Sequence, residues 1–347
     1  MNEDMKEREE LLNRITQLET AVRAMHEWQN GIGEILNEMT GMIEDHEKRQ
    51  EQILWNVRIN RWRVDSLPYE LSDPDHTSAV FKPRILSVEE TRRQIIDEKK
   101  SIGRLGDGEL ALIFGEQRWN FQRADEALAD RMKQVLTSDE EGFLVGLNPN
   151  FFGNLEHLPE ADADGVRSFM TPDMRKNLAM LLSREKQYGN LLIHRLDTSV
   201  DIQNIRRLWD GCECIFVEGE YTRAGVGNDL FSNIGSIERI LCPAENAFDR
   251  YDDIMNAVLG QSKDKLIMLA LGPTATVLAY DLYKAGYHAV DIGHLDLVYE
   301  KYLAGYGSLT DVRIPYKYCN MDETGNGRRI EDIDDGVYRS QIISRIL

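Results

Sequence analysis

Residues 265–286 read "KLIMLALGPTATVLAYDLYKAG" and combine a strand, a turn and a helix in one stretch. The apolar run 265–271 predicts a buried strand, the Gly272-Pro273 pair predicts a turn, and the periodic apolar residues that follow predict a helix. Other apolar runs repeat this alternation and are separated by helical stretches such as 124–136 and 248–260. The further strand candidates are 101–105, 142–147, 190–195, 212–219, 239–243 and 288–293.

Strands that alternate with helices predict an α/β fold with a Rossmann-like, mostly parallel sheet and helices on both of its faces. In such folds ligands bind beyond the carboxyl ends of the strands. We therefore expect function in the loops that follow the strands.

Composition narrows the class of protein. The formal net charge of −19 argues against a nucleic-acid partner, because phosphate backbones select Lys and Arg. Four cysteines suggest neither a disulfide framework nor a zinc finger. No signal peptide and no apolar run of membrane-spanning length is visible, so the cytoplasm is the expected location.

The first sixty or so residues follow a heptad repeat. The predicted a positions run from Ile15 to Val57, the d positions run from Leu11 to Ile53, and most of both sets are apolar. Such a repeat predicts a coiled coil and a homo-oligomer, or a rod that docks a partner. The alternative is an amphipathic helix packed on its own domain.

These patterns divide the chain into four parts. Residues 1–64 are the predicted coiled coil, and 65–86 are a linker marked by Pro68 and two further prolines. Residues 87–325 form the predicted α/β domain, and 326–347 form a charged C-terminal tail.

Two acids follow the strand candidate 101–105. Asp107 and Glu109 are separated by Gly108 alone, so both carboxylates can face one hard cation at a turn. The same spacing recurs at Asp139 and Glu141, where we interpret a solvated turn, so spacing alone is a weak signal.

A second polar loop follows the strand candidate 212–219. It contains acids, an arginine and a Gly-x-Gly that lacks the third glycine of a dinucleotide fingerprint. Either this loop binds a ligand, or it is a long connection that ends in a helix cap. Its residues of interest are Glu218, Arg223, Gly225, Gly227, Asn228 and Asp229.

Two other strand ends carry polar groups. Gly272, Thr274 and Thr276 lie where a helix begins and suit a phosphate, although a threonine there can be a simple N-cap. His294 could donate to a phosphate, and Asp296 could act as a base or bind sugar hydroxyls. A lone histidine at a strand end is more often structural.

These segments together resemble the bacterial GT-D-type glycosyltransferases, which include enzymes that glycosylate serine-rich-repeat adhesins. The resemblance rests on "GRLGDGEL", "YGNLLIHR", "VEGEYTRAGVGNDLF", "LGPTATVLAYDL" and "DIGHLDLVYE", and covers roughly residues 85–320. The N-terminal coiled coil looks like an addition to the family domain.

The resemblance implies a nucleotide-sugar donor, usually a UDP-sugar, a saccharide-bearing acceptor and Mn²⁺ or Mg²⁺. Its Asp-x-Glu motif matches Asp107 and Glu109, which it implicates in metal and diphosphate contact, and Arg104 lies just before it. If the anomeric centre inverts, a base is needed, and the candidates are Glu218, Asp229 and Asp296.

The chain departs from the family pattern at Met321, where relatives have Lys-Tyr-x-Asn-Glu, so the identity of the acceptor is open. Two other functions fit parts of the sequence. One is a metal-dependent phosphohydrolase of nucleotide or sugar phosphates, and the other is a non-catalytic assembly protein built on the coiled coil.

Overall fold

The structure of the chain is a computed structural model that describes residues 2–71, 80–116, 121–305, 314–318 and 330–347. The chain divides into two compact units, residues 1–65 and residues 66–347. None of the described helices combines the length and the apolar character needed to cross a lipid bilayer.

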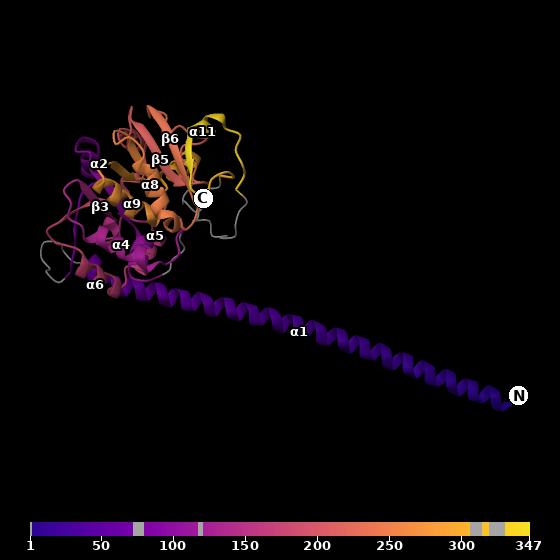
Figure 1. The fold of residues 1–347 in the computed structure, drawn as a ribbon. Coiled ribbons are helices and arrows are strands. Elements are labelled where there is room, and N and C mark those ends of the chain that lie inside the picture. The colour runs from indigo at the N-terminus through magenta and orange to yellow at the C-terminus, as the bar shows by residue number, and fades with distance from the viewer. Residues whose placement is uncertain (1, 72–79, 117–120, 306–313, 319–329) are drawn as a thin grey trace. The chain divides into compact units, whose positions relative to one another are not determined.

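The first unit is a single helix. Helix α1 (Asn2–Glu70) is continuous (Figure 1), and it extends roughly 100 Å at 1.5 Å per residue. The apolar residues of the heptad repeat are all exposed on this helix. A single copy of the helix cannot bury them. The helix is confirmed, whereas its pairing into a coiled coil stays a prediction. The exposed residues are Leu11, Ile15, Leu18, Val22, Met25, Ile32, Leu36, Met39, Ile43, Ile53 and Val57.

Within the described residues, the second unit is built on a nine-stranded sheet in which every neighbouring pair is parallel, and the predicted α/β class is confirmed. The strand order is β1-β4-β3-β2-β8-β7-β5-β6-β9. The strands are β1 (Arg84–Ile85), β2 (Ser101–Leu105), β3 (Phe143–Leu147), β4 (Gln187–Asn190), β5 (Glu213–Gly219), β6 (Ser236–Cys242), β7 (Leu266–Ala270), β8 (His288–Asp291) and β9 (Ile342–Arg345).

Helices cover both faces of this sheet. Strand β5 alternates between two hydrophobic clusters, with Ile215 and Val217 in one and Cys214 and Phe216 in the other. Strand β7 alternates in the same way, which shows that the clusters lie on opposite faces. The helices are α2 (Val88–Asp97), α3 (Asp107–Ile113), α4 (Glu126–Thr137), α5 (Glu160–Phe169), α6 (Pro172–Leu181), α7 (Ser199–Arg206), α8 (Tyr251–Leu259), α9 (Pro273–Lys284), α10 (Leu295–Ala304) and α11 (Gly336–Gln341), with 3₁₀ turns at Pro149–Phe151, Leu191–His194 and Ala247–Arg250.

Both ends of the predicted domain differ from expectation. Helix α1 continues through Pro68 to Glu70, inside the predicted linker 65–86, and its last residue, Glu70, binds Arg167 at 2.8 and 2.9 Å. The predicted tail 326–347 contributes α11 and β9, so it is not simply a tail. Strand β9 adds to the edge of the sheet beside β6, and Ile346 donates its N–H to Leu241 O at 2.8 Å.

The strand predicted over 190–195 lies earlier in the chain. Strand β4 ends at Asn190, whose side chain accepts the Leu192 N–H at 2.9 Å and starts a 3₁₀ turn. This turn carries His194 to the carboxyl end of the sheet.

Candidate active site

A cavity of about 1120 Å³ lies at the carboxyl ends of the parallel strands. Its wall contains residues that end or directly follow each strand from β2 to β8. Strands β2 and β8 are neighbours in the sheet. From β2 the chain continues to β3 on one side, and from β8 it continues to β9, which lies at the edge on the other side. Such a reversal of strand order leaves a crevice for ligands.

A buried ion pair lies at this crevice. Arg104, on β2, and Asp291, at the end of β8, are joined by a contact of 3.3 Å between Nη2 and Oδ1. The Asp291 carboxylate also accepts the backbone N–H groups of Arg104 at 3.2 Å and Gly293 at 3.0 Å. Burial raises the pKa of the Asp291 carboxyl, and the Arg104 guanidinium and these N–H groups act in the opposite direction.

Two histidines stand beside this pair. His194 Nδ1 lies 2.7 Å from Arg104 Nη1, and the rings of His194 and His294 meet edge to face at 5.5 Å between centroids. Burial and the Arg104 charge lower the pKa of His294 to about 4, and they also hold the pKa of His194 well below its usual value. Both imidazoles are therefore neutral near pH 7, and His294 lines the cavity as predicted.

The two predicted metal ligands begin helix α3. Asp107 is the first residue of that helix and is exposed, while Glu109 accepts the Gly106 N–H at 2.9 Å in a capping box. Burial raises the pKa of Glu109 to about 7, with smaller contributions from the charges of Asp291 and Asp107. Both acids line the cavity.

Helix α9 begins at the cavity, but its threonines do not line it. Gly272 lies in the wall, whereas Thr274 and Thr276 are fully buried. Thr276 Oγ1 donates to Arg104 O at 2.7 Å, and Thr274 Oγ1 donates to Gln122 Oε1 at 3.4 Å. The two hydroxyls therefore bind β2 and the 121–123 segment, and the prediction that they hold a phosphate is not supported by this placement.

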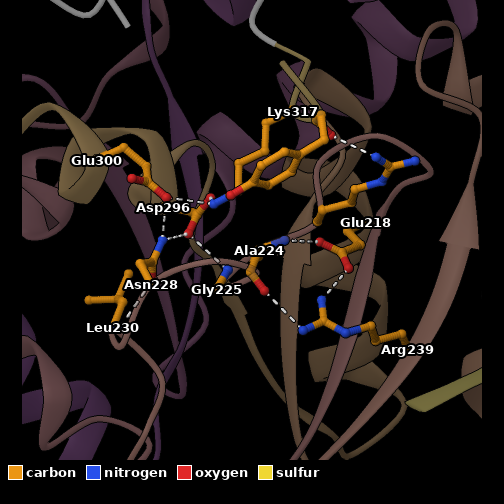
Figure 2. Close-up of polar contacts among 11 residues, drawn as sticks. Glu218, Ala224, Gly225, Asn228, Leu230, Arg239, Asp296, Glu300 and Lys317 are labelled. Atoms are coloured by element: carbon orange, nitrogen blue, oxygen red, sulfur yellow. Dashed lines mark hydrogen bonds and ion pairs between the residues drawn. The ribbon is translucent and has the colours of Figure 1, made fainter. Parts of the chain in front are cut away.

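Glu218 lies in the interior, where it contacts Ala224 and Arg239 (Figure 2), and it is not part of the cavity wall. Its side chain is 0% exposed, and its Oε1 lies 2.5 Å from Arg239 Nη1. Its Oε2 accepts the Ala224 N–H at 2.9 Å, while Arg239 Nη2 donates to Ala224 O at 2.9 Å. This arrangement shapes the loop after β5 and argues against Glu218 as a base.

Asp296 lines the cavity, but its oxygens are already engaged (Figure 2). Its Oδ1 accepts Gly225 N–H and Asn228 Nδ2, each at 2.8 Å, and its Oδ2 lies 2.7 Å from Lys317 Nζ. Burial acts to lower the pKa of Lys317, but Asp296 and Glu300 outweigh it and raise that pKa. Asp296 is thus better suited to hold the loop in place than to remove a proton.

The remaining predicted residues of this loop lie outside the wall. Asp229 is exposed, forms an ion pair with Arg206 at 3.0 Å and accepts Tyr299 Oη at 2.6 Å. Arg223 Nη1 donates to Tyr316 O at 2.9 Å and to Glu331 O at 2.8 Å. A Cβ on Gly227 would lie 2.1 Å from Tyr316 Oη. Arg223 and Gly227 thus contact the C-terminal segment, and Asp229 contacts α7 and α10, so none of the three faces a ligand in the cavity.

The family is decided by comparison with known proteins. Residues 102–322 match the family model described as "Glycosyltransferase GT-D fold". The chain belongs to the GT-D-fold glycosyltransferase family. The GT-D match covers most of the parallel sheet and its loops, while α1 precedes it.

Two curated relatives of this GT-D family member come from streptococci. "Probable glycosyl transferase Gly" of Streptococcus gordonii is 32% identical over 76% of the chain, and "Glycosyltransferase GlyD" of Streptococcus pneumoniae serotype 4 is 30% identical over 76%. The chain spans only 39% and 33% of the lengths of these two relatives.

Solved structures agree with the GT-D assignment. "The highly conserved domain of unknown function 1792 has a distinct glycosyltransferase fold" describes one that is 33% identical, with a TM-score of 0.68 over 76% of this chain and 96% of the other. "A New Glycosyltransferase (DUF1792) from Streptococcus sanguinis" describes another, 30% identical, with a TM-score of 0.69 over 77% of this chain and 100% of the other.

Sequence reasoning missed part of the GT-D cavity wall. His194 lay inside a predicted strand, and Phe121 carried no periodic signal. Phe121 and Tyr318 meet edge to face at 5.3 Å on this wall, although 197 positions separate them in the chain. Gly272 beside Phe121 has a φ of +54°, a conformation that residues with a side chain rarely adopt. Only the assembled sheet brings such groups together.

Proposed function

We propose that this GT-D glycosyltransferase moves a sugar from a nucleotide diphosphate sugar, and specifically a UDP-sugar, to a saccharide-bearing acceptor. The observation that carries the proposal is the polar end of the cavity, where Arg104, His294 and the start of α9 converge. A diphosphate offers oxygens to guanidinium and imidazole donors, and a helix N-terminus favours negative charge. The apolar and aromatic remainder of the wall suits a nucleobase and sugar rings.

We propose Mn²⁺ or Mg²⁺ as the cofactor. Among the described residues no three His, Cys, Asp or Glu side chains cluster as a metal site, so the protein alone offers two carboxylates, Asp107 and Glu109. That set fits Mg²⁺ or Mn²⁺ when the other ligands are substrate phosphates and water. A bound divalent cation would neutralise charge on the departing diphosphate. It would also favour the ionised form of Glu109.

The residues of this chain have separate parts in such a reaction. Arg104 and His294 would hold the diphosphate, and Asp296 would keep the Gly225 loop against the cavity. Asp296 is the one predicted base that lines the cavity, but with three hydrogen bonds on its oxygens it acts as a positioning residue in our proposal.

We also propose that α1 associates with α1 of a second copy. Its apolar stripe spans residues 11–57 and is exposed throughout, and pairing with α1 of a second copy would bury this stripe along its whole length. Sedimentation equilibrium tests this: the wild-type chain is expected to form oligomers, and Leu36→Glu is expected to shift it toward monomers. The control is Glu34→Lys on the opposite side of the helix, and equal masses for both variants would refute the pairing.

Among the described residues, Cys212, Cys214 and Cys242 are free thiols, and burial raises the pKa of the last two to about 12. Buried, unreactive thiols suit a reducing compartment, so the cytoplasm stays our predicted location.

The proposed donor is tested by thermal melting with a panel of nucleoside diphosphates, with and without Mn²⁺. A ligand that binds only the folded state stabilises it by about 2.7 kcal/mol at a hundred times its dissociation constant. We expect UDP with Mn²⁺ to raise the melting temperature more than UDP alone. A larger shift with another nucleotide would change the donor, and no shift with any of them would refute nucleotide binding.

A further inference from the structure

One nitrogen of His194 has two neighbours that it cannot satisfy together. Nδ1 lies 2.7 Å from Arg104 Nη1 and 2.8 Å from Leu191 O. A guanidinium only donates hydrogen bonds and a carbonyl oxygen only accepts them. A neutral imidazole can therefore accept from Arg104 with its proton on Nε2, or donate to Leu191 O with its proton on Nδ1, but not both.

Asp291, the other partner of the Arg104 guanidinium, also has further hydrogen-bond donors. Asp291 contacts Arg104 Nη2 at 3.3 Å, which is long for a charge-assisted hydrogen bond. Its carboxylate keeps the backbone N–H groups of Arg104 and Gly293 wherever the guanidinium points. Both groups that hold the guanidinium would thus remain hydrogen-bonded if it moved away.

The guanidinium itself is incompletely satisfied where it rests. Among the described residues Arg104 Nε is buried and has no hydrogen-bond partner, although the side chain lines the cavity and is 8% exposed. Leaving a buried donor unpaired is unfavourable, so an anion that reaches Nε would gain a donor that the protein leaves unused.

Gly293 makes this resting position possible. A Cβ at residue 293 would lie 1.7 Å from Arg104 Nη2, and the φ of +50° is one that side chains disfavour. The close approach of backbone and guanidinium thus requires glycine at this turn after β8.

We propose that Arg104 rests against His194 in the free protein and turns to an anionic oxygen, of the diphosphate class, when ligand enters the cavity, while His194 changes tautomer and donates to Leu191 O. This inference rests on the proposed function for the identity of the ligand. His194 is then a positioning residue: it holds Arg104 in the empty cavity and competes with the ligand for it.

The alternative partner is what makes the exchange inexpensive. If His194 had only Arg104 on Nδ1, movement of Arg104 would leave a buried imidazole nitrogen unsatisfied. Leu191 O removes that cost because the proton shifts between the ring nitrogens by ordinary exchange with water. The anion then competes against a hydrogen bond between Arg104 and a neutral ring, and against the long 3.3 Å ion pair of Arg104 with Asp291, which its own negative charge replaces.

Nitrogen-15 NMR of histidine-labelled protein reads the tautomer directly. The chain contains seven histidines, so His194→Gln assigns the resonance by its absence. We expect Nδ1 to be unprotonated in the free protein and protonated when UDP or inorganic pyrophosphate is added to saturation. A protonated Nδ1 in the free protein, or an unchanged tautomer at saturation, would overturn the proposal.

Calorimetric titration with UDP and with pyrophosphate tests the proposal independently, through the direction in which a substitution changes the binding affinity. His194→Phe removes the competitor, so we expect binding about threefold to tenfold tighter, equivalent to one net hydrogen bond. In an Arg104→Met background the same His194→Phe change is expected to have no effect, as a double-mutant cycle requires. Weaker binding by His194→Phe alone would show that His194 prepares Arg104 for the ligand, and would refute competition.

The two proposals fail in different ways. If wild-type protein binds neither nucleoside diphosphates nor pyrophosphate, the proposed donor and the release of Arg104 both fail. The tautomer of free His194 still decides whether Arg104 rests on that ring. If these ligands bind and the tautomer stays fixed, the donor stands and the inference about His194 is refuted.

Discussion

Substitution of Glu218 distinguishes a structural role of this residue from a catalytic one. We predict that Glu218→Gln destabilises the second unit but leaves the reaction rate of folded protein within about twofold of wild type. The carboxylate is fully buried against Arg239, so the substitution leaves that arginine without an opposing charge. Removing one partner of a buried pair costs about 3–5 kcal/mol.

That cost converts to a melting shift through the size of the unit. Residues 66–347 are about 280 residues, and unfolding entropy is about 2.1 cal/mol/K per residue, so each kcal/mol corresponds to about 1.7 °C. We therefore expect Glu218→Gln to melt roughly 5–9 °C below wild type by differential scanning calorimetry.

The matched control is Glu238→Gln on the adjacent strand β6. Glu238 pairs with Lys265 at 2.7 Å but is partly exposed, and such pairs contribute at most about 1 kcal/mol. If Glu218→Gln has the same melting temperature as Glu238→Gln but abolishes sugar transfer, the structural assignment is wrong and Glu218 is again a candidate base.

Three further predictions follow from local geometry. Gly227→Ala is expected to lower the free energy of unfolding by about 1 kcal/mol or more, because φ is +81° and the new Cβ would lie 2.1 Å from Tyr316 Oη. Denaturant melts measure this change, and an unchanged midpoint would contradict the tight contact. Burial lowers the pKa of His288 to about 4, so protonation favours the unfolded chain, and the stability that this group contributes is complete above pH 6.5 and lost as the pH falls toward 4. His288→Gln should therefore flatten the dependence of melting temperature on pH between 6.5 and 4, and an unchanged slope would count against the lowered pKa. Asp229→Asn is expected to leave the transfer rate within about twofold of wild type, since Asp229 is exposed and outside the cavity wall; a rate lower by a hundredfold would restore it as a base.

The strand–helix alternation predicted the fold class because each buried strand is a short apolar run between turn signals. Strand β9 was missed because its Ile-Ile-Ser-Arg sequence follows a charged stretch and adds only an edge to the sheet. The early end of β4 was missed because the Asn190 cap is a side-chain contact that periodicity does not reveal.

The candidate site was predicted in part for a similar reason. Groups that directly follow strands, such as Asp107 and His294, do line the cavity. Acids at strand ends cannot be ranked from sequence, because the distinction between Glu218 and Asp296 depends on partners as remote as Arg239 and Lys317. Those partners lie on other elements and are positioned only by the folded sheet.

We propose above that the protein transfers a sugar from a nucleotide diphosphate donor. The most direct measurement follows nucleoside diphosphate release from a panel of nucleotide sugars, with Mn²⁺, in the presence and absence of saccharide acceptors. We predict that a UDP-sugar is consumed faster with acceptor and that each UDP released is matched by one glycosylated product. Equal rates with and without acceptor, with free sugar or phosphate as the product, would contradict a transferase and indicate a hydrolase.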